Sequence, residues 1–159
     1  MNIKLICVGT LKEKFFKDAI NEYTKRLKPF CNFEICEIPE YKLGKNFSKK
    51  DIINALENEK DKILSLIPKN TYIVSLCVEG KSLNSLELAQ KIENISLNGR
   101  SSIAFIIGSS FGLSENLKRV SNLCLSMSNL TFPHQLARVM LIEQIYRSFQ
   151  IINGTKYHK

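Results

Sequence analysis

The chain has 159 residues and a formal net charge of +8 at neutral pH, with 44% hydrophobic and 24% charged residues. This length and composition are typical of one globular domain and exclude a disordered or fibrous chain. No apolar run approaches the ~18 residues that span a bilayer, and Lys4 interrupts the first apolar run with no cleavage site after it. We therefore expect a cytoplasmic protein of one domain, residues 1–159, that binds no membrane.

The basic charge is spread along the chain. Lys and Arg number 23 against 15 Asp and Glu, and the excess lies near both ends of the sequence rather than in one tail. A folded basic protein of this kind favours a polyanionic partner, with nucleic acid ahead of a membrane surface. A generic basic surface is the alternative.

The cysteines and histidines do not indicate a metal site. The five cysteines form no CxxC pair and no Cys/His spacing typical of zinc, so we expect free thiols in a reducing compartment. His134 and His158 are the only histidines, and no carboxylate cluster accompanies either. His134 follows Pro133 at an expected helix start, which favours a plain helix-terminus role. No metal is expected.

Strand-like and helix-like patterns alternate through the first half of the chain. Ser48 and Asp51 form a capping-box pattern that opens a helix, and Pro29 and Pro68 mark helix ends. In chain order, the patterns predict a strand over residues 3–8, a helix over 11–28, a strand over 30–38, a polar connection over 39–47 and a helix that opens at Ser48 and ends before Pro68.

The second half repeats the alternation. It predicts a strand over residues 71–78, a helix over 85–97, a strand over 102–107, a short helix from the Ser114 cap to about 120, a strand over 123–127 and a helix over 134–152. Strands that alternate with helices predict an α/β domain with a mostly parallel sheet and helices on both faces.

The last expected helix, residues 134–152, is apolar nearly all round. A terminal helix that covers one face of a sheet needs only one apolar stripe. The surplus of apolar residues indicates a second buried contact, most simply the subunit interface of a homodimer.

Two loops that follow expected strands are candidate ligand sites. Residues 108–112 and 127–133 both come after strands, and parallel α/β sheets bind ligands at the carboxyl ends of their strands. The first loop matches neither the dinucleotide motif GxGxxG nor the phosphate motif GxxxxGK[ST]. Ordinary turns are the alternative for both loops.

Charged residues interrupt the apolar surface of the last expected helix. Burial of a charge there costs free energy unless the charge is paired or has a functional role, and this applies to Arg138, Glu143 and Arg147. Glu143 and Arg147 have the spacing of an ion pair. A structural ion pair and a functional one are both open readings. The chain then ends in a titratable Tyr-His-Lys tip over residues 157–159, which is unusual for a frayed terminus.

Three segments resemble one known family. They are the opening CVGTLK (residues 7–12), the run FPHQLARVMLIEQIYR (132–147) and the ending YHK (157–159). Together with the chain length and the order of expected elements, they are similar to the ribosomal RNA large subunit methyltransferase H family. These are small SPOUT-class enzymes that methylate N3 of a pseudouridine in 23S rRNA. The family usually has Gly-Gly after the strand, whereas this chain has Gly108-Ser109, in which Gly108 still allows close backbone approach.

The resemblance implies a homodimeric α/β fold with a C-terminal trefoil knot that binds S-adenosyl-L-methionine. Carried over residue by residue, the resemblance places the cofactor at the end of the expected strand 71–78, at the loop that begins at Gly108 and at the loop of residues 127–132. The implied cofactor-binding residues are Leu76, Gly108, Met127, Ser128, Asn129, Leu130, Thr131 and Phe132. Backbone groups of these loops suit the polar edge of adenine, and Leu76 suits the apolar surface of the cofactor.

Three residues are candidates for catalysis on the acceptor side. Arg138 is suited to orient the base and stabilise negative charge, and Tyr157 is suited to stack on the base or hydrogen-bond it. An imidazole has an unperturbed pKa of about 6.5, so His158 suits a general base. We expect the tail to act across the dimer interface, because the helix before it indicates a shared surface.

The expected substrate is 23S rRNA within the assembled ribosome. The expected fold uses all 159 residues and leaves no appended RNA-binding module, so neighbouring RNA and protein are expected to complete the site. Two alternatives stay open. One is a catalytically inactive RNA- or ribosome-binding protein of the same fold, and the other is a tRNA methyltransferase.

Overall fold

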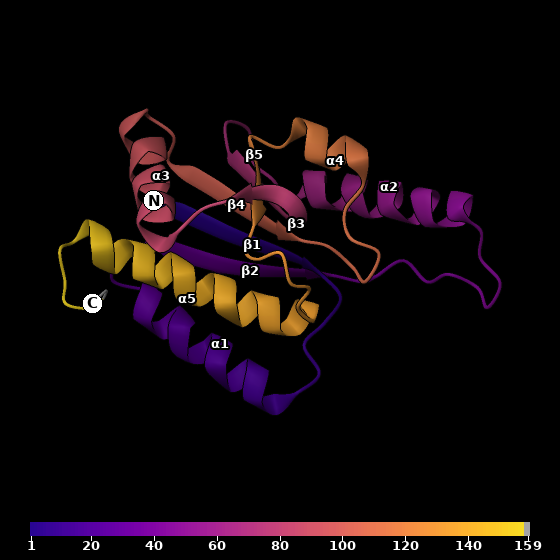
Figure 1. The fold of residues 1–159 in the computed structure, drawn as a ribbon, viewed down its shortest axis with the longest axis horizontal. Coiled ribbons are helices and arrows are strands. Elements are labelled where there is room, and N and C mark those ends of the chain that lie inside the picture. Colours follow the sequence, from indigo (N-terminus) through magenta and orange to yellow (C-terminus); the bar gives the residue numbers. More distant parts are fainter. Residues whose placement is uncertain (158–159) are drawn as a thin grey trace.

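A five-stranded sheet with helices against both faces forms the protein (Figure 1). The structure is a computed structural model and describes residues 1–157. The strands are β1 (Asn2–Val8), β2 (Asn32–Ile38), β3 (Tyr72–Ser82), β4 (Ser102–Ile107) and β5 (Leu123–Ser126). The helices are α1 (Lys14–Leu27), α2 (Lys49–Ser65), α3 (Ser85–Leu97), α4 (Glu115–Val120) and α5 (His134–Ile152).

The strands of the sheet are parallel. Their order is β2-β1-β4-β3-β5, and each neighbouring pair runs in the same direction. Parallel neighbours need long crossover connections, and a helix lies between each strand and the next along the chain. The predicted α/β class with a parallel sheet is confirmed. The trefoil knot that the resemblance implies stays a prediction.

Two apolar cores lie on the two faces of the sheet. Side chains of β1 alternate between them, with Leu5 and Cys7 in one core and Ile6 and Val8 in the other. The first core packs the sheet against α1, α3 and α5, and the second packs it against α2 and α4. Figure 1 shows α2 and α4 together on one side, away from α1 and α5. The predicted helices on both faces are confirmed.

Helices α2 and α4 begin at the capping residues that the sequence predicts. The Ser48 side chain accepts a hydrogen bond from the Asp51 backbone N–H, and Asp51 accepts one back from the Ser48 backbone N–H. The Ser114 side chain accepts a hydrogen bond from the Leu117 backbone N–H. These bonds satisfy backbone donors that have no partner inside the helix, which fixes where each helix begins.

Helix α1 begins at Lys14, later than the sequence pattern predicts. The Leu11 backbone N–H donates to Glu37 Oε1 at 3.1 Å, and the Lys12 backbone N–H donates to Gln135 Oε1 at 3.0 Å. Both acceptors belong to other elements, so residues 11 and 12 form a connection instead of a first helical turn. These distant side chains are not visible to a local sequence pattern.

Strand β3 is longer than predicted because it bulges and then rejoins β5. Leu125 of β5 pairs with Leu76 and, past the irregularity, with Lys81. A Cβ atom on Gly80 would lie 2.7 Å from the backbone carbonyl of Cys124. Gly80 therefore allows the second half of β3 to pair closely with β5, where any side chain would hold the strands apart.

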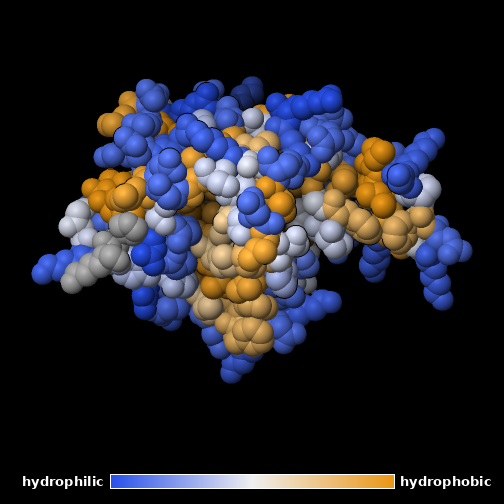
Figure 2. All heavy atoms as spheres, in the orientation of Figure 1, coloured by the Kyte–Doolittle hydropathy of each residue, from blue (hydrophilic) through white to orange (hydrophobic). Residues whose placement is uncertain are grey.

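Every residue of α5 is buried or half-buried, although Leu136 and Met140 lie outside both apolar cores. Figure 2 shows a band of apolar side chains at the lower centre of the view, over α5 and the first turn of α1. Phe15 in that turn is 62% exposed.

None of the helices within residues 1–157 has the length and apolar character to cross a membrane.

Candidate functional site

A cavity of about 750 Å³ opens where the carboxyl ends of β4, β3 and β5 meet. The irregular middle of β3, the loops after β4 and β5, Lys118 of α4 and the first turn of α5 form its walls. Leu76, Ile107 and Leu125 give it an apolar interior. Its size and mainly apolar lining are typical of small-molecule sites, and its place at the carboxyl edge is where parallel sheets bind ligands.

Most of the residues implied as cofactor-binding come together in this cavity. Its lining includes Leu76, Gly108, Met127, Ser128, Leu130, Thr131 and Phe132. Asn129 is not part of the lining. The loop after β5 is fixed by its own serines, since Ser126 Oγ donates to the Ser128 carbonyl at 3.1 Å and Ser128 Oγ accepts from the Leu130 backbone N–H at 3.0 Å.

The loop after β4 turns sharply at its two glycines. A Cβ atom on Gly108 would lie 2.1 Å from the Gly112 carbonyl oxygen, and Gly112 has a φ of +85°. The close approach that requires glycine at position 108 is therefore to the loop itself. Ser109 next to it is buried, lines the cavity, and its hydroxyl has no hydrogen-bond partner within residues 1–157.

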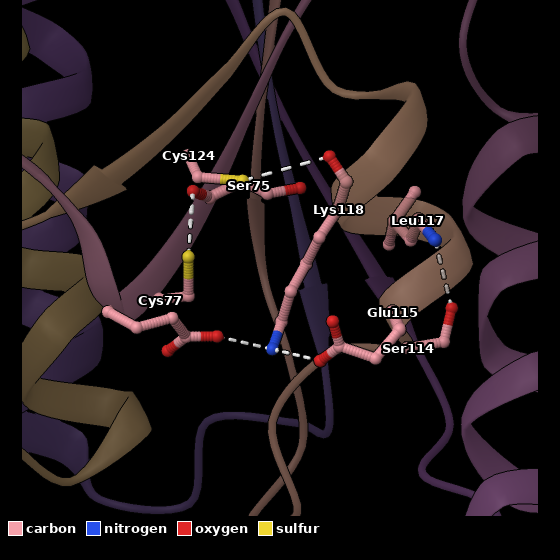
Figure 3. A network of polar contacts seen from close by, with 8 residues as sticks. Ser75, Cys77, Ser114, Glu115, Leu117, Lys118 and Cys124 are labelled. Carbon is pink, nitrogen blue, oxygen red and sulfur yellow. Dashed lines mark hydrogen bonds and ion pairs between the residues drawn. The ribbon is translucent and has the colours of Figure 1, made fainter.

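Lys118 of α4 reaches the cavity wall between two carboxylates (Figure 3). Its ammonium pairs with Glu115 at 2.8 Å and with Glu79 of β3. Burial lowers the pKa of Lys118, but the hydrogen bonds to Glu115 and Glu79 outweigh it and leave that pKa above its ordinary value. The bond from Lys118 in turn lowers the pKa of Glu79. The wall thus carries a fixed positive and a fixed negative charge.

The Cys77 thiol also lines the cavity, close to Cys124 on the next strand (Figure 3). Burial, with a smaller contribution from Cys124, raises the pKa of Cys77 to about 12. The thiol is therefore neutral at physiological pH and a poor nucleophile. All five cysteines are free, as predicted, and within residues 1–157 no three Cys, His, Asp or Glu side chains gather as metal ligands do.

Arg138 lies inside the protein and not on the cavity wall. Its Nη1 donates to Glu37 Oε1 at 2.6 Å, and its Nη2 donates to the carbonyls of Val8 at 3.1 Å and Gly9 at 2.7 Å. Its side chain is 0% exposed. The guanidinium therefore fastens the first turns of α5 to the ends of β1 and β2. The role of Arg138 in orienting the base and stabilising negative charge stays a prediction.

Tyr157 lies against α5 and does not line the cavity of the same chain. Its hydroxyl donates to Glu143 Oε1 at 3.2 Å, and the Arg147 guanidinium stands 4.8 Å from its ring centre. Glu143 and Arg147 form the predicted ion pair at 2.6 Å. Burial and hydrogen bonding raise the pKa of Tyr157 to about 12, so its hydroxyl stays protonated. The predicted general base, His158, lies outside the described residues.

Several lining residues lie outside the predicted site residues and the two candidate loops, and Glu79, His134 and Lys118 are the charged or titratable ones that matter most here. Glu79 and His134 stand at the ends of predicted elements, next to the loops that the sequence singled out, so their position in the chain was an available signal. Phe111 lies in the candidate loop 108–112, whereas Lys118 belongs to no motif and only the fold brings it to the cavity. His134 also lies beside the end of β1, since a Cβ on Gly9 would be 3.8 Å from its Nε2.

Comparisons with known proteins agree with this architecture. The sequence model of a family described as "Predicted SPOUT methyltransferase" matches residues 1–158. The chain is 48% identical over 159 residues to the ribosomal RNA large subunit methyltransferase H of Clostridium botulinum (strain Alaska E43 / Type E3), and 48% identical over 159 residues to that of Clostridium acetobutylicum. Both alignments cover 100% of each chain.

A solved structure shows the same fold at low sequence identity. It is "a probable methylase family protein" from Haemophilus influenzae Rd KW20, with a TM-score of 0.56 and 12% identity over 99% of this chain and 70% of that chain. One conclusion follows from the sequence matches over the full length of the chain, together with the parallel sheet and the cavity at its carboxyl edge. The chain belongs to the SPOUT methyltransferase family, in the group of the ribosomal RNA large subunit methyltransferase H proteins.

Proposed function

We propose that this protein transfers a methyl group from S-adenosyl-L-methionine to N3 of pseudouridine 1915 of 23S rRNA, in the assembled ribosome. The observation that carries the proposal is the cavity of about 750 Å³, which gathers the loops after β4 and β5 at the carboxyl edge of the sheet. Family membership supplies the reaction class, and the names of the full-length relatives support the large-subunit RNA as substrate.

The cavity fits this cofactor in size and in chemistry. Leu76 and Leu125 offer apolar surface to an adenine ring. Glu79 and Lys118 offer a negative and a positive charge, which suit the amino and carboxylate groups of a methionine moiety. When bound, S-adenosyl-L-methionine supplies a methyl group already activated by its positive sulfur. The chain then has to align and shield that group.

On the acceptor side, the proton on N3 has to leave. We propose His158 as the group that takes it, because a neutral imidazole accepts a proton near physiological pH. Tyr157 stays protonated, so it serves as a hydrogen-bond donor or a stacking surface. Arg138 is a positioning residue in this proposal, because its three bonds hold the end of β1 beside His134.

We further propose that each tail completes the cavity of a second subunit. Tyr157 is bonded to Glu143, six residues along α5 from Ala137 at the cavity, and this separation corresponds to about 9 Å of helix. Within one chain, the described part of the tail therefore lies away from the cavity. The apolar band over α5 supports a homodimer that brings the tail of one subunit to the cavity of the other.

Two measurements test the proposed function. Calorimetric titration with S-adenosyl-L-methionine is expected to show binding by the wild type and none by Thr131→Trp, which fills the cavity from an exposed loop position. Ribosomes from a strain that lacks the gene are expected to gain one N3-methylpseudouridine in 23S rRNA, as read by nucleoside mass mapping. Protein-free rRNA fragments are expected to be poor substrates.

The alternatives give different results in the same assays. A wild type that binds ribosomes but no S-adenosyl-L-methionine would be a non-catalytic member of the fold. Methyl transfer to tRNA with unmodified 23S rRNA would identify a tRNA methyltransferase. Either result would overturn the proposal.

A further inference from the structure

Two aromatic rings stay exposed beside the cavity. Phe111 lines the cavity and is 42% exposed, and Phe47 from the connection between β2 and α2 is 46% exposed. Their ring centres are 5.6 Å apart, with the planes at 79°, so the edge of one ring meets the face of the other. The pair therefore presents aromatic surface to solvent at the mouth of the proposed cofactor site.

Polar anchors hold this pair in place. Ser110 Oγ, in the loop of Phe111, donates to Glu40 Oε1 at 3.0 Å. Glu59 of α2 is 4% exposed, and its Oε1 accepts from the Tyr41 backbone N–H at 2.9 Å. The two loops are thus fixed to each other and to α2 by hydrogen bonds. The rings are positioned without being buried, which is typical of side chains kept available for a partner.

The same connection is basic. We define the basic aromatic arm as residues 41–50, which contain exposed aromatic rings alternating with exposed lysines. These residues are Tyr41, Lys42, Lys45, Phe47, Lys49 and Lys50. None of the four lysines forms an ion pair with residues 1–157. Stacking rings interleaved with free positive charges are the combination that binds single-stranded nucleic acid.

We infer that the basic aromatic arm binds unpaired rRNA nucleotides next to the acceptor. Phe47 stacks on one base, the Phe111 ring supports Phe47 at the cavity mouth, and Lys42 and Lys45 contact the phosphates of the same strand. Because Phe111 lines the cavity, a strand held on this pair is led to the methyl-transfer site. The inference rests on the proposed function for the identity of the RNA, and on the structure for the surface.

Variants of Phe47 test the stacking step. Binding to a fluorescein-labelled oligouridine, followed by anisotropy, is expected to weaken about tenfold in Phe47→Ala and to stay near wild type in Phe47→Trp, because stacking depends on the ring. The KM for ribosomes is expected to rise by a similar factor, whereas the Kd for S-adenosyl-L-methionine stays unchanged. Leu97→Ala is the control, since Leu97 is 77% exposed at the end of α3.

Lysine variants test the phosphate contacts. Lys42→Gln combined with Lys45→Gln is expected to reduce the slope of log K against log salt for the oligouridine by about 1.4, the value for two phosphate contacts on a single strand. The control combines Lys28→Gln with Lys69→Gln. These lysines precede β2 and β3 at the opposite edge of the sheet, so the charge change is equal and the slope is expected to hold.

The outcomes separate this inference from the proposed function. If the wild type methylates ribosomes and Phe47→Ala leaves both the oligouridine Kd and the ribosome KM within twofold, the arm does not bind RNA and the inference is overturned. If Phe47→Ala raises the ribosome KM alone, the arm contacts a ribosomal protein, which also overturns it. If the wild type transfers no methyl group, the proposed function fails, and the oligouridine titrations still decide the inference.

Discussion

Arg138 is the largest side chain that the fold buries completely. A buried cation is tolerated only when its donors are matched, and here Glu37 and the Val8 and Gly9 carbonyls accept from the guanidinium. Its Nε alone has no partner within residues 1–157. The residue therefore holds three elements together at the carboxyl edge of the sheet, beneath the candidate site.

Arg138→Ala is expected to lower the free energy of unfolding by about 3 kcal/mol, because it leaves the Glu37 carboxylate and two carbonyls without their donor. Urea denaturation measures the loss. Arg26→Ala is the matched control, since Arg26 pairs with Glu22 on the surface of α1, and its stability should match that of the wild type. Equal effects of the two substitutions would contradict a structural role for the buried pair.

Glu59 gives the protein a pH-dependent stability. Burial raises the pKa of Glu59 in the folded state, so the folded protein binds this proton more tightly than the unfolded chain. The contribution of Glu59 to the free energy of unfolding is then most favourable below the ordinary glutamate pKa. It is lost as pH rises through the pKa that Glu59 has in the folded state. We expect Glu59→Gln to raise the urea midpoint at pH 7 and to change it less at pH 4.

Glu57→Gln is the control for this prediction. The hydrogen bond from Lys60 lowers the pKa of Glu57, so its contribution has the opposite sign and is lost as pH falls through the folded-state value. Glu57→Gln should therefore lower the midpoint at pH 7. Shifts of the same sign in both variants would show that burial does not govern Glu59.

At the scale of elements, the cavity depends on how the irregular part of β3 and the loops after β4 and β5 approach one another. Gly80 lets the second half of β3 rejoin β5, and Gly108 lets the loop after β4 fold onto Gly112. Each position would place a Cβ atom inside the contact distance of backbone atoms. The walls of the cavity are therefore set by two close backbone approaches, and side chains fill the space that remains.

Gly108→Ala is expected to abolish S-adenosyl-L-methionine binding and to lower Tm, because the new Cβ would lie 2.1 Å from the Gly112 carbonyl oxygen and the loop has to move. Gly44→Ala is the control, since no atom lies within 4 Å of a Cβ at that position. Calorimetric titration and thermal unfolding of both variants provide the readout. Normal cofactor binding by Gly108→Ala would show that the loop adapts.

At the scale of the whole molecule, the surplus apolar surface of α5 sets the expected assembly. Leu136 and Met140 are half-buried without belonging to a core, and Phe15 in the first turn of α1 is 62% exposed. Figure 2 shows a band of apolar side chains over α5 and that turn. A patch of half-buried and exposed apolar side chains of this kind is typical of a subunit interface. The dimer would place two cavities and two tails in one particle.

Met140→Glu is expected to convert a dimer into a monomer, because it places a charge in the apolar band. Light scattering coupled to size exclusion measures the mass. Leu97→Glu introduces the same charge at an exposed position on α3 and is expected to leave the mass unchanged. A Met140→Glu protein that keeps the wild-type mass would exclude this face as the interface.

Mixed dimers test whether the tail acts across the interface. Subunits that lack residues 157–159 and subunits with Thr131→Trp are each expected to be inactive in methyl transfer to ribosomes. After mixing, one of the two cavities pairs an open cofactor site with an intact tail from the other subunit, so activity should return to part of the wild-type level. Absence of recovery, with mixed dimers verified by mass, would favour action within one subunit.

Much of this site could be predicted from local sequence. Helix α5 and strand β4 have the predicted bounds, because periodicity and flanking signals are local and strong there. The loops after β4 and β5 were singled out because ligands bind after strand ends. Lys118 was not predicted because it reaches the cavity from α4, at a position without a motif.

The sequence by itself determined the α/β class, the strand and helix order, the helix caps and the two loops of the site, since each depends on residues close together in the chain. Only the tertiary structure decided that Arg138 is buried against Glu37 and that Tyr157 lies against Glu143. It also decided that the close backbone approach at Gly108 is to Gly112 of the same loop. It also decided that Phe47 meets Phe111. The physical reason is that these contacts join segments whose approach depends on strand order and on packing of the whole sheet, which no local pattern encodes.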